Sequence, residues 1–151
     1  MLSQIQFATP LGPLNVGENN GAIEWVAFGD LLRAPLPETP LLCEARAQLL
    51  AYFDGRLKAF DLPLAPRGTE FRQRVWQALR EIPYGTTATY GQIAARIGSP
   101  KASRAVGQAN HDNPIAILIP CHRVIGADGA LTGYAGGLDI KARLLQLEGA
   151  L

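Results

Sequence analysis

The chain uses cysteine twice and histidine twice, and it places one of each side by side, at Cys121 and His122. The pair follows an apolar run within the stretch "NPIAILIPCHRVIGADG", from Asn113 to Gly129. A thiol attacks as its thiolate, and a reference pKa of about 8.5 leaves only a few per cent of it ionised at neutral pH. A reactive Cys121 therefore needs a neighbouring base or a positive field.

The apolar run from Ile115 to Ile119 is expected to be a buried β segment or an extended piece that lines the core, and Pro120 ends it because proline lacks a backbone donor. Cys121 would then lie at the exit of a buried segment, where a reactive group can be held rigidly. Adjacent residues of an extended chain point to opposite faces, so direct contact between Cys121 and His122 is not implied. A water molecule could join them instead.

Three kinds of site compete for these residues. A metal site needs three or four ligands, and two cysteines and two histidines far apart in the sequence show no ligand spacing. A cysteine hydrolase would need a distant histidine, for which His111 is the other candidate, and no oxyanion motif is evident. The third alternative, a buried cysteine beside a hydrogen-bonded histidine, is purely structural and is favoured by these residues alone.

Length and composition are those of an ordinary folded protein. A chain of 151 residues with 48% hydrophobic and 18% charged side chains can bury a core without disulfide bonds or metal ions. We find no apolar run near the ~18 residues that a membrane span needs and no signal peptide, so we expect the cytoplasm, where thiols stay reduced. Residues 1–65 carry four basic and seven acidic side chains, whereas residues 66–151 carry ten and six. This asymmetry is weak support for a polyanionic partner.

The first part of the chain, residues 1–65, predicts a small β-rich domain. Two strands are expected around the turn Pro10-Leu11-Gly12, and a third in "GAIEWVAFGD". Thr39 precedes a proline and predicts the start of a helix, which Gly55 can end. Cys43 on this helix is expected to be a small buried residue.

The second part, residues 66–151, is predicted to be a mainly helical domain, reached through the linker "FDLPLAPRGTE". Thr69 is expected to cap a helix in "EFRQRVWQALREI". Thr89 begins a capping box and a second helix that Gly98 ends, and Ser99-Pro100 is expected to begin a third helix at once. Two short helices joined in this way are typical of a helix-turn-helix.

The predicted third helix, "PKASRAVGQAN", consists almost entirely of small residues apart from Lys101, Arg104 and Gln108. A helix face of small residues can approach another backbone closely. That backbone could be a DNA duplex or a neighbouring helix of the protein, and the helix alone does not decide between them.

Taken together, these motifs closely resemble the O6-alkylguanine-DNA alkyltransferase family, whose members are also called methylated-DNA–protein-cysteine methyltransferases. The resemblance runs from Phe71 to Gly149 through "VWQALREIPYG", "TYGQIAARIG", "SRAVGQAN", "NP-x-x-ILI", "PCHRV", "GYAGG" and "LLQLEG", in this order. It is loose over the N-terminal half. It implies an α/β (α+β) fold, with a small ribonuclease H-like β-rich domain followed by a helical, winged helix-turn-helix-like domain.

The resemblance also implies a DNA repair protein without a cofactor. Such a protein transfers a methyl or other alkyl group from O6-alkylguanine, and from O4-alkylthymine as well, to its own cysteine, irreversibly and in a single turnover. The implied partner is double-stranded DNA containing O6-alkylguanine. We expect no membrane, no metal and no obligatory protein partner.

Five residues receive catalytic roles from the resemblance. Cys121 accepts the alkyl group, while His122, acting through a water molecule, and Glu148 form the network that activates it. Tyr90 supplies the hydroxyl that protonates the departing guanine. Asn113 braces the segment that carries the nucleophile.

Contacts with the base and the DNA are implied for a further set. Arg104 fills the gap that the flipped base leaves, Tyr134 lines the base pocket, and Val124 offers its main-chain carbonyl to the guanine amino group. Close approach in the minor groove and a phosphate contact involve small residues of one helix, which are Ala102, Ser103, Ala105 and Gly107. The family often has a serine after the pocket tyrosine, and Ala135 in its place removes one side-chain hydrogen bond.

Two further hypotheses remain open. A damage sensor could bind the alkylated base without transfer, but relatives of that type lack the cysteine, and Cys121 is present. A helix-turn-helix regulator would need side chains that read base edges, and these are scarce in residues 100–110. Binding that ignores sequence but prefers O6-alkylguanine would exclude the regulator.

Overall fold

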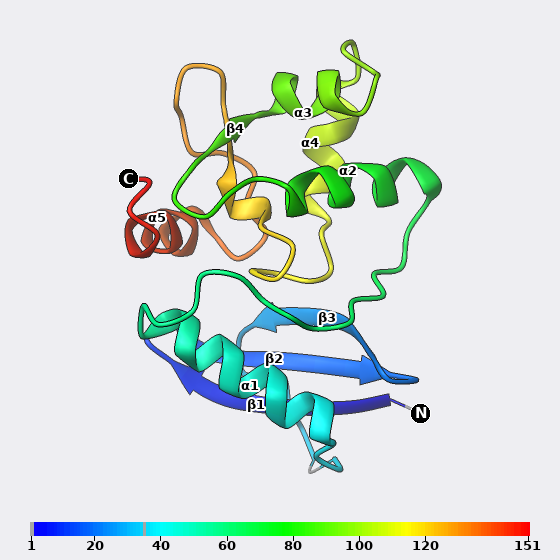
Figure 1. The fold of residues 1–151 in the computed structure, drawn as a ribbon, viewed down its shortest axis with the longest axis vertical. Helices are drawn as coiled ribbons and strands as arrows, with labels where there is room; N and C mark the ends of the chain where they lie inside the picture. The colour runs from blue at the N-terminus through cyan, green and yellow to red at the C-terminus, as the bar shows by residue number, and fades with distance from the viewer. Residues whose placement is uncertain (1, 35) are drawn as a thin grey trace. The chain divides into compact units, whose positions relative to one another are not determined.

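The computed structural model describes residues 2–34 and 36–151. They fall into two compact units, the first ending at Arg67 and the second covering Gly68–Leu151 (Figure 1). Strands dominate the first unit and helices the second, so the predicted α/β class is confirmed. Within the described ranges, no helix is both long enough and apolar enough to cross a membrane.

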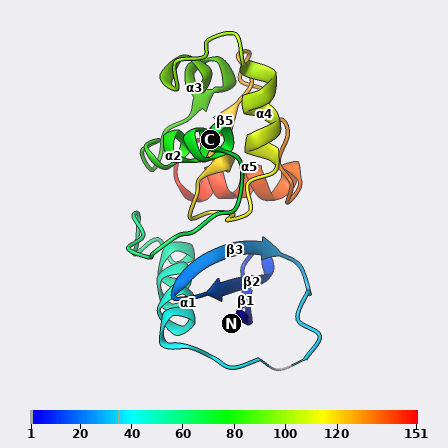
Figure 2. The same ribbon diagram turned by 90° about the vertical axis from the view of Figure 1, so that its right-hand side faces the viewer.

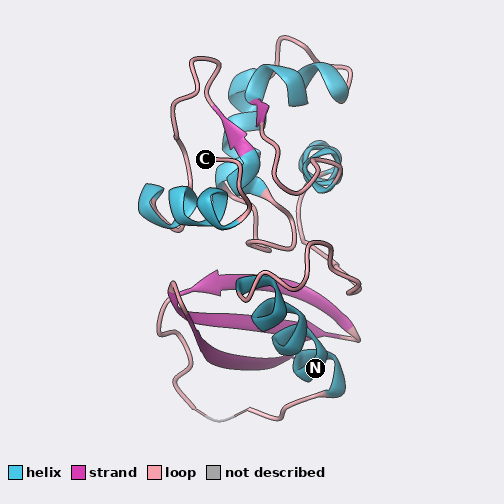
Figure 3. Ribbon diagram, turned by 60° about the vertical axis from the view of Figure 1, so that its left-hand side comes forward, coloured by secondary structure: helices cyan, strands magenta, loops and turns pink. Residues whose placement is uncertain are grey.

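The first unit is built on an antiparallel sheet of β1 (Leu2–Thr9), β2 (Gly12–Asn19) and β3 (Ala22–Phe28), in this order (Figure 3). All three strands match the prediction. Asn20 and Gly21 join β2 to β3 with positive φ angles of 53° and 80°. Such a two-residue turn has the twist that an antiparallel hairpin needs, and asparagine followed by glycine adopts it most readily.

One helix, α1 (Pro40–Phe53), covers a face of this sheet (Figure 2). Thr39 caps it as predicted, since its hydroxyl accepts a hydrogen bond from the Leu42 amide at 3.1 Å. Cys43 departs from the prediction: it is half-buried, with its sulfur 3.8 Å from the Arg46 guanidinium. The inward positions of the helix and sheet, all fully buried, are Leu14, Val16, Ile23, Leu42, Leu49 and Tyr52.

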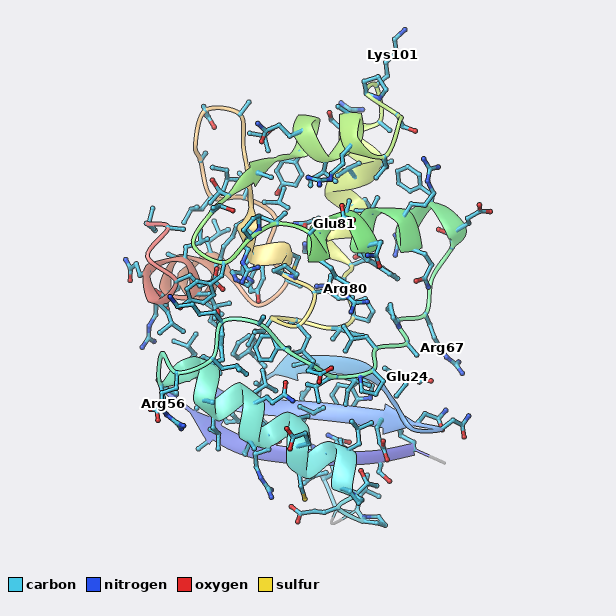
Figure 4. The ribbon with its side chains drawn as sticks, in the orientation of Figure 1. Glu24, Arg56, Arg67, Arg80, Glu81 and Lys101 are labelled. Carbon is cyan, nitrogen blue, oxygen red and sulfur yellow. The ribbon has the colours of Figure 1, made fainter. Side chains whose placement is uncertain are left out.

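Part of the predicted linker belongs to the first unit. The Ile23 amide donates to the Pro63 carbonyl at 2.8 Å, and the Ala65 amide donates to the Ile23 carbonyl at 2.8 Å. This short stretch therefore uses backbone groups on the outer edge of β3 that would otherwise need water. Arg67 and Glu24, both labelled in Figure 4, form an ion pair at 3.7 Å in the same unit.

The second unit contains helices and short strands that surround the segment of Cys121. In chain order they are α2 (Glu70–Arg80), β4 (Ala88–Thr89), α3 (Tyr90–Arg96), α4 (Ser103–His111), a 3-10 turn η1 (Cys121–Arg123), β5 (Val124–Ile125) and α5 (Leu138–Leu147). The strands β4 and β5 pair in parallel. Because β4 leads directly into α3 and β5 directly follows η1, this pairing connects α3 and the segment of Cys121 to the same two-stranded sheet.

Two of the predicted helix starts are confirmed by their caps. The Thr69 hydroxyl accepts from the Arg72 amide at 3.2 Å. The Thr89 hydroxyl accepts from the Gln92 amide at 3.1 Å, and the Gln92 side chain accepts from the Thr89 amide at 2.8 Å, which completes the capping box.

The start of α4 was predicted three residues too early. Ser99 and Pro100 do not begin a helix, because the Ala102 amide donates to the Ser99 carbonyl at 2.9 Å and closes a turn. Proline is favoured at the second position of a β-turn as well as at the first position of a helix. The helix begins only at Ser103, without a side-chain cap.

Trp76 fastens α2 to α4 inside the second unit. Its ring is almost fully buried, and its indole nitrogen donates to the Ala109 carbonyl at 2.9 Å. Gly68 leaves room for the ring, because a Cβ there would lie 2.5 Å from it. This contact fixes α2 and α4 relative to each other within the unit.

Candidate active site

The segment before Cys121 is buried, but it is a turn and not the predicted strand. Ile117 has a positive φ of 70°, which no extended chain adopts. The Asn113 side chain donates to the carbonyls of Ile119 at 2.9 Å and Ile115 at 3.3 Å, and accepts from the Ile115 amide at 3.0 Å. Asn113 thus satisfies locally the backbone groups that a neighbouring strand would otherwise have paired.

Cys121 begins η1 and is 5% exposed. Burial raises the pKa of its thiol to about 11, while a hydrogen bond from the Asn113 side chain, the positive charge of Lys141 and backbone hydrogen bonds act in the opposite direction. The residue is therefore a thiol at neutral pH. Attack by its sulfur requires that the proton be removed as the substrate reacts.

His122 and Glu148 form a fully buried pair, with Nε2 of the ring 2.7 Å from Oε2 of the carboxylate. Burial lowers the pKa of His122, although Glu148 opposes the shift. The ring is thus neutral at neutral pH, with the proton on Nε2 donated to Glu148. Nδ1 is buried and has no hydrogen-bond partner within the described part of the chain, so it is the nitrogen that can accept a proton.

Arg123 holds the same carboxylate from the other side. Its Nε lies 2.8 Å from Oε1 of Glu148 and its Nη2 lies 3.0 Å from Oε2, while Nη1 donates to the Ile82 carbonyl at 2.7 Å. Two-pronged pairing of this kind fixes the orientation of a carboxylate as well as its charge. Arg123 was not predicted from the sequence, where the available signal was its position directly after His122.

Lys141 is a second residue of the site that was not predicted from the sequence. It is fully buried, and its ammonium donates to the carbonyls of Val124 and, at 2.7 Å, Thr132. Burial lowers its pKa to about 8, against the opposing influence of Cys121. Lys141 therefore ties α5 to β5 and to the loop that precedes Tyr134, and the Val124 carbonyl expected to meet guanine already accepts one hydrogen bond.

Tyr90, the first residue of α3, reaches the same loop. Its hydroxyl lies 3.1 Å from the Thr132 carbonyl oxygen and 3.1 Å from the Thr132 hydroxyl. One edge of its ring faces Gly107 of α4, where a Cβ would lie 3.7 Å away. The Tyr90 side chain is thus confined between α4 and the loop.

Tyr134 lies on the inner side of that loop and is buried, whereas Ala135 after it is exposed. Burial raises the pKa of the Tyr134 hydroxyl well above its ordinary value, and the nearby charges of Cys121 and Glu148 act in the same direction. Its oxygen has no hydrogen-bond partner among residues 2–34 and 36–151. The electrostatic influence of Cys121 on this hydroxyl indicates that Tyr134 lies in the neighbourhood of the nucleophile.

The residues expected to contact DNA separate into two groups on α4. Ser103, Arg104 and Ala105 are exposed in its first turn, and Ala102, which precedes the helix, is half-buried. Gly107, by contrast, packs inward against Tyr90. Lys101 extends outward from the preceding turn (Figure 4).

The described residues contain no group of three or more histidine, cysteine, aspartate or glutamate side chains that could hold a metal ion. Cys43 and Cys121 are both free thiols, and they belong to different units. As a free thiol beside the His122–Glu148 pair, Cys121 is the candidate nucleophile of the site.

Fold and site define a class of protein in which a buried cysteine, backed by a histidine–glutamate pair, lies in the same unit as a helix-turn-helix pair. The profile of the 6-O-methylguanine DNA methyltransferase DNA binding domain matches residues 70–150, and that of the ribonuclease-like domain matches residues 5–66. The chain belongs to the 6-O-methylguanine DNA methyltransferase family.

Individual relatives agree with this assignment. A methylated-DNA–protein-cysteine methyltransferase of Methanosarcina acetivorans is 55% identical over 95% of this chain and 96% of its own length. The crystal structure of Mycobacterium tuberculosis O6-methylguanine methyltransferase covers 99% of this chain and 94% of its own, with 46% identity and a TM-score of 0.90. A structure of the Mycobacterium tuberculosis protein in complex with DNA covers 97% and 92%, with 48% identity and a TM-score of 0.89.

Proposed function

We propose that this protein repairs DNA by transferring a methyl or other alkyl group from O6-alkylguanine to Cys121, irreversibly and once per molecule. The observation that carries the proposal is the buried His122–Glu148 pair, joined at 2.7 Å, directly after Cys121. The names of the full-length relatives, methylated-DNA–protein-cysteine methyltransferases, support the same activity. We extend the proposal to O4-alkylthymine, which the resemblance also implies.

The first requirement of this reaction is loss of the Cys121 proton. We assign the role of base to Nδ1 of His122, which receives the proton through a water molecule. The imidazolium that forms is stabilised by Glu148, which is already hydrogen-bonded to the other ring nitrogen. Arg123 keeps the carboxylate in place throughout.

The thiolate then attacks the alkyl carbon. The bond between sulfur and carbon forms, the bond between carbon and O6 breaks, and its electron pair passes to the guanine. Tyr90 donates a proton to the departing base, Tyr134 lines the pocket, and the Val124 carbonyl accepts from the guanine amino group. The proton lost by Cys121 replaces the one that Tyr90 gave, so the overall products are a thioether and ordinary guanine.

We assign DNA binding and transfer to residues 66–151, with residues 1–65 as a separate β-rich domain. The alkylated base must leave the duplex to reach a buried sulfur, at a cost of a few kcal/mol. The exposed Arg104 is suited to fill the vacated stack. Ala102, Ser103 and Ala105 permit close approach in the minor groove.

The test is to mix the protein with DNA that carries a labelled methyl group on O6 of guanine. Label is expected on the protein at no more than one equivalent, and the variant Cys121→Ser should take none. Turnover well beyond one equivalent would exclude the proposal. A damage sensor that only binds the lesion is the alternative, and tight binding of the lesion without any label on the protein would establish it instead.

A further inference from the structure

Thr132 contacts Tyr90 with two of its groups, and the proposed function gives it no role. The Tyr90 hydroxyl oxygen is 3.1 Å from the Thr132 carbonyl oxygen and 3.1 Å from the Thr132 hydroxyl. The same carbonyl oxygen also accepts a hydrogen bond from the buried ammonium of Lys141 at 2.7 Å. A single loop residue thus connects Tyr90 with a buried cation.

The chemistry of these groups fixes the direction of each hydrogen bond. A tyrosine hydroxyl has one proton, and a carbonyl oxygen can only accept. The Tyr90 proton therefore goes to the Thr132 carbonyl, and the Thr132 hydroxyl donates to the Tyr90 oxygen. A donor on the Tyr90 oxygen can stay hydrogen-bonded to that oxygen after its proton has left.

The space around the hydroxyl is limited. Gly133 has a φ of +64°, and a Cβ there would lie 3.1 Å from the Tyr90 hydroxyl oxygen. Gly107 of α4 packs against the edge of the Tyr90 ring. The phenol is thus held within hydrogen-bond distance of Thr132, because the loop and α4 leave it little space to move.

We propose that Thr132 is a positioning residue for Tyr90, whose hydroxyl it orients and whose oxygen it stabilises while the proton passes to the departing guanine. The inference rests on the proposed function. As the carbon–O6 bond breaks, the Tyr90 proton moves to a ring nitrogen of guanine and the negative charge remains on the phenol oxygen. The Thr132 hydroxyl keeps donating to that oxygen, while Lys141 keeps the Thr132 carbonyl hydrogen-bonded after Tyr90 has given up its proton.

The test compares Thr132→Val, which removes only the hydroxyl, with Thr132→Ser, which retains it. Single-turnover transfer from O6-methylguanine in duplex DNA should slow by about 10- to 100-fold in the valine variant and recover in the serine variant. Thr87→Val, which removes an exposed hydroxyl elsewhere in the unit, is the matched control and should transfer at the wild-type rate.

A second reaction separates assistance to the leaving group from a structural effect. In a Cys43→Ser background, 4,4′-dithiodipyridine reacts with Cys121 without any guanine leaving group, so Thr132→Val should leave this rate unchanged. Equal slowing of both reactions would overturn the inference. In a Tyr90→Phe background, Thr132→Val should cause no further slowing, and a full additional loss would also overturn it.

A failure of the proposed function and a failure of the Thr132 role give different results. A wild-type protein that takes no label from the DNA contradicts the proposed function itself. A wild-type protein that takes label while Thr132→Val takes it equally fast contradicts only the role of Thr132.

Discussion

The Glu148 carboxylate forms hydrogen bonds with two buried side chains, those of His122 and Arg123. One of its oxygens meets the His122 ring at 2.7 Å, and Arg123 binds both oxygens at 2.8 and 3.0 Å. The carboxylate lies at the C-terminal end of α5, where the helix dipole is unfavourable to an anion. The arginine supplies the positive charge that makes a buried carboxylate tenable there, and the histidine uses that carboxylate in the proposed chemistry.

Replacement of Glu148 should therefore be costly to the fold. In Glu148→Gln the buried Arg123 guanidinium loses its counter-charge, and breaking a buried pair in this way costs roughly 3–5 kcal/mol. The free energy of unfolding, measured with urea, should fall by about this amount.

The double variant Arg123→Met, Glu148→Gln is the control. It leaves neither member of this buried pair charged without its partner, so it should recover a large part of the lost stability even though two native residues are missing. Costs that simply add in the double variant would show that the pair is not energetically coupled.

The exposed side chains of helix α4 can be replaced one at a time to test their roles in DNA binding and transfer. Arg104→Ala should slow transfer from duplex DNA by about 10- to 100-fold, because flipping then lacks the side chain proposed to fill the gap. Transfer from the same lesion in a single-stranded oligonucleotide should change little, since no stack needs to be refilled. Rates measured under saturating protein give the comparison.

Lys101→Ala is the matched control for this experiment. It removes the same charge from the turn before α4, where the lysine is exposed. It should weaken binding to both substrates in a salt-dependent way without separating them. Equal losses on duplex and single strand for Arg104→Ala would argue that this arginine contributes only charge.

Helix starts could be predicted from the sequence wherever the signal was local. Thr39, Thr69 and Thr89 each accept a hydrogen bond from an amide three residues on, and such caps depend on neighbouring residues alone. Pro100 was ambiguous, because a helix start and a β-turn use proline equally well. The run ending at Ile119 was misassigned because apolar residues in succession do not reveal that Asn113 closes a turn over them.

Some residues of the candidate site could be identified from the sequence, and others could not. His122 and Glu148 were identified through the resemblance, and the structure brings them into contact. Arg123, Lys141 and Thr132 were not, because their importance lies in contacts with residues distant in the chain. A lysine in a helical pattern predicts an exposed position. Nothing in the neighbouring sequence indicates that the Lys141 ammonium donates hydrogen bonds to two carbonyl oxygens inside the protein.

For the whole molecule, the buried histidine should make stability depend on pH. Burial lowers the pKa of His122 in the folded state, so between about pH 7 and 5 the unfolded chain gains a proton that the folded protein does not. Stability contributed by neutral His122 is complete above its unfolded pKa of about 6.5 and is lost as the pH falls toward the folded value. The slope can approach about 1.4 kcal/mol per pH unit.

Urea unfolding at a series of pH values measures this slope, and His122→Gln should flatten it. The shifts of other groups fall elsewhere: the pKa of Asp112 is lowered through its hydrogen bond with Gln108, and those of Cys121 and Lys141 stand at about 11 and about 8. A slope between pH 7 and 5 that is the same with and without His122 would contradict the assignment.

The two tryptophans of the chain are divided between the units, with Trp25 on β3 in the first and Trp76 on α2 in the second. Each unit therefore contains its own intrinsic fluorophore. In Trp25→Phe, all indole emission comes from Trp76, which is buried and hydrogen-bonded to Ala109 near the C-terminal end of α4. Fluorescence can thus follow unfolding of the alkyltransferase unit alone, and it can report whether alkylation of Cys121 disturbs that unit before the rest of the molecule responds.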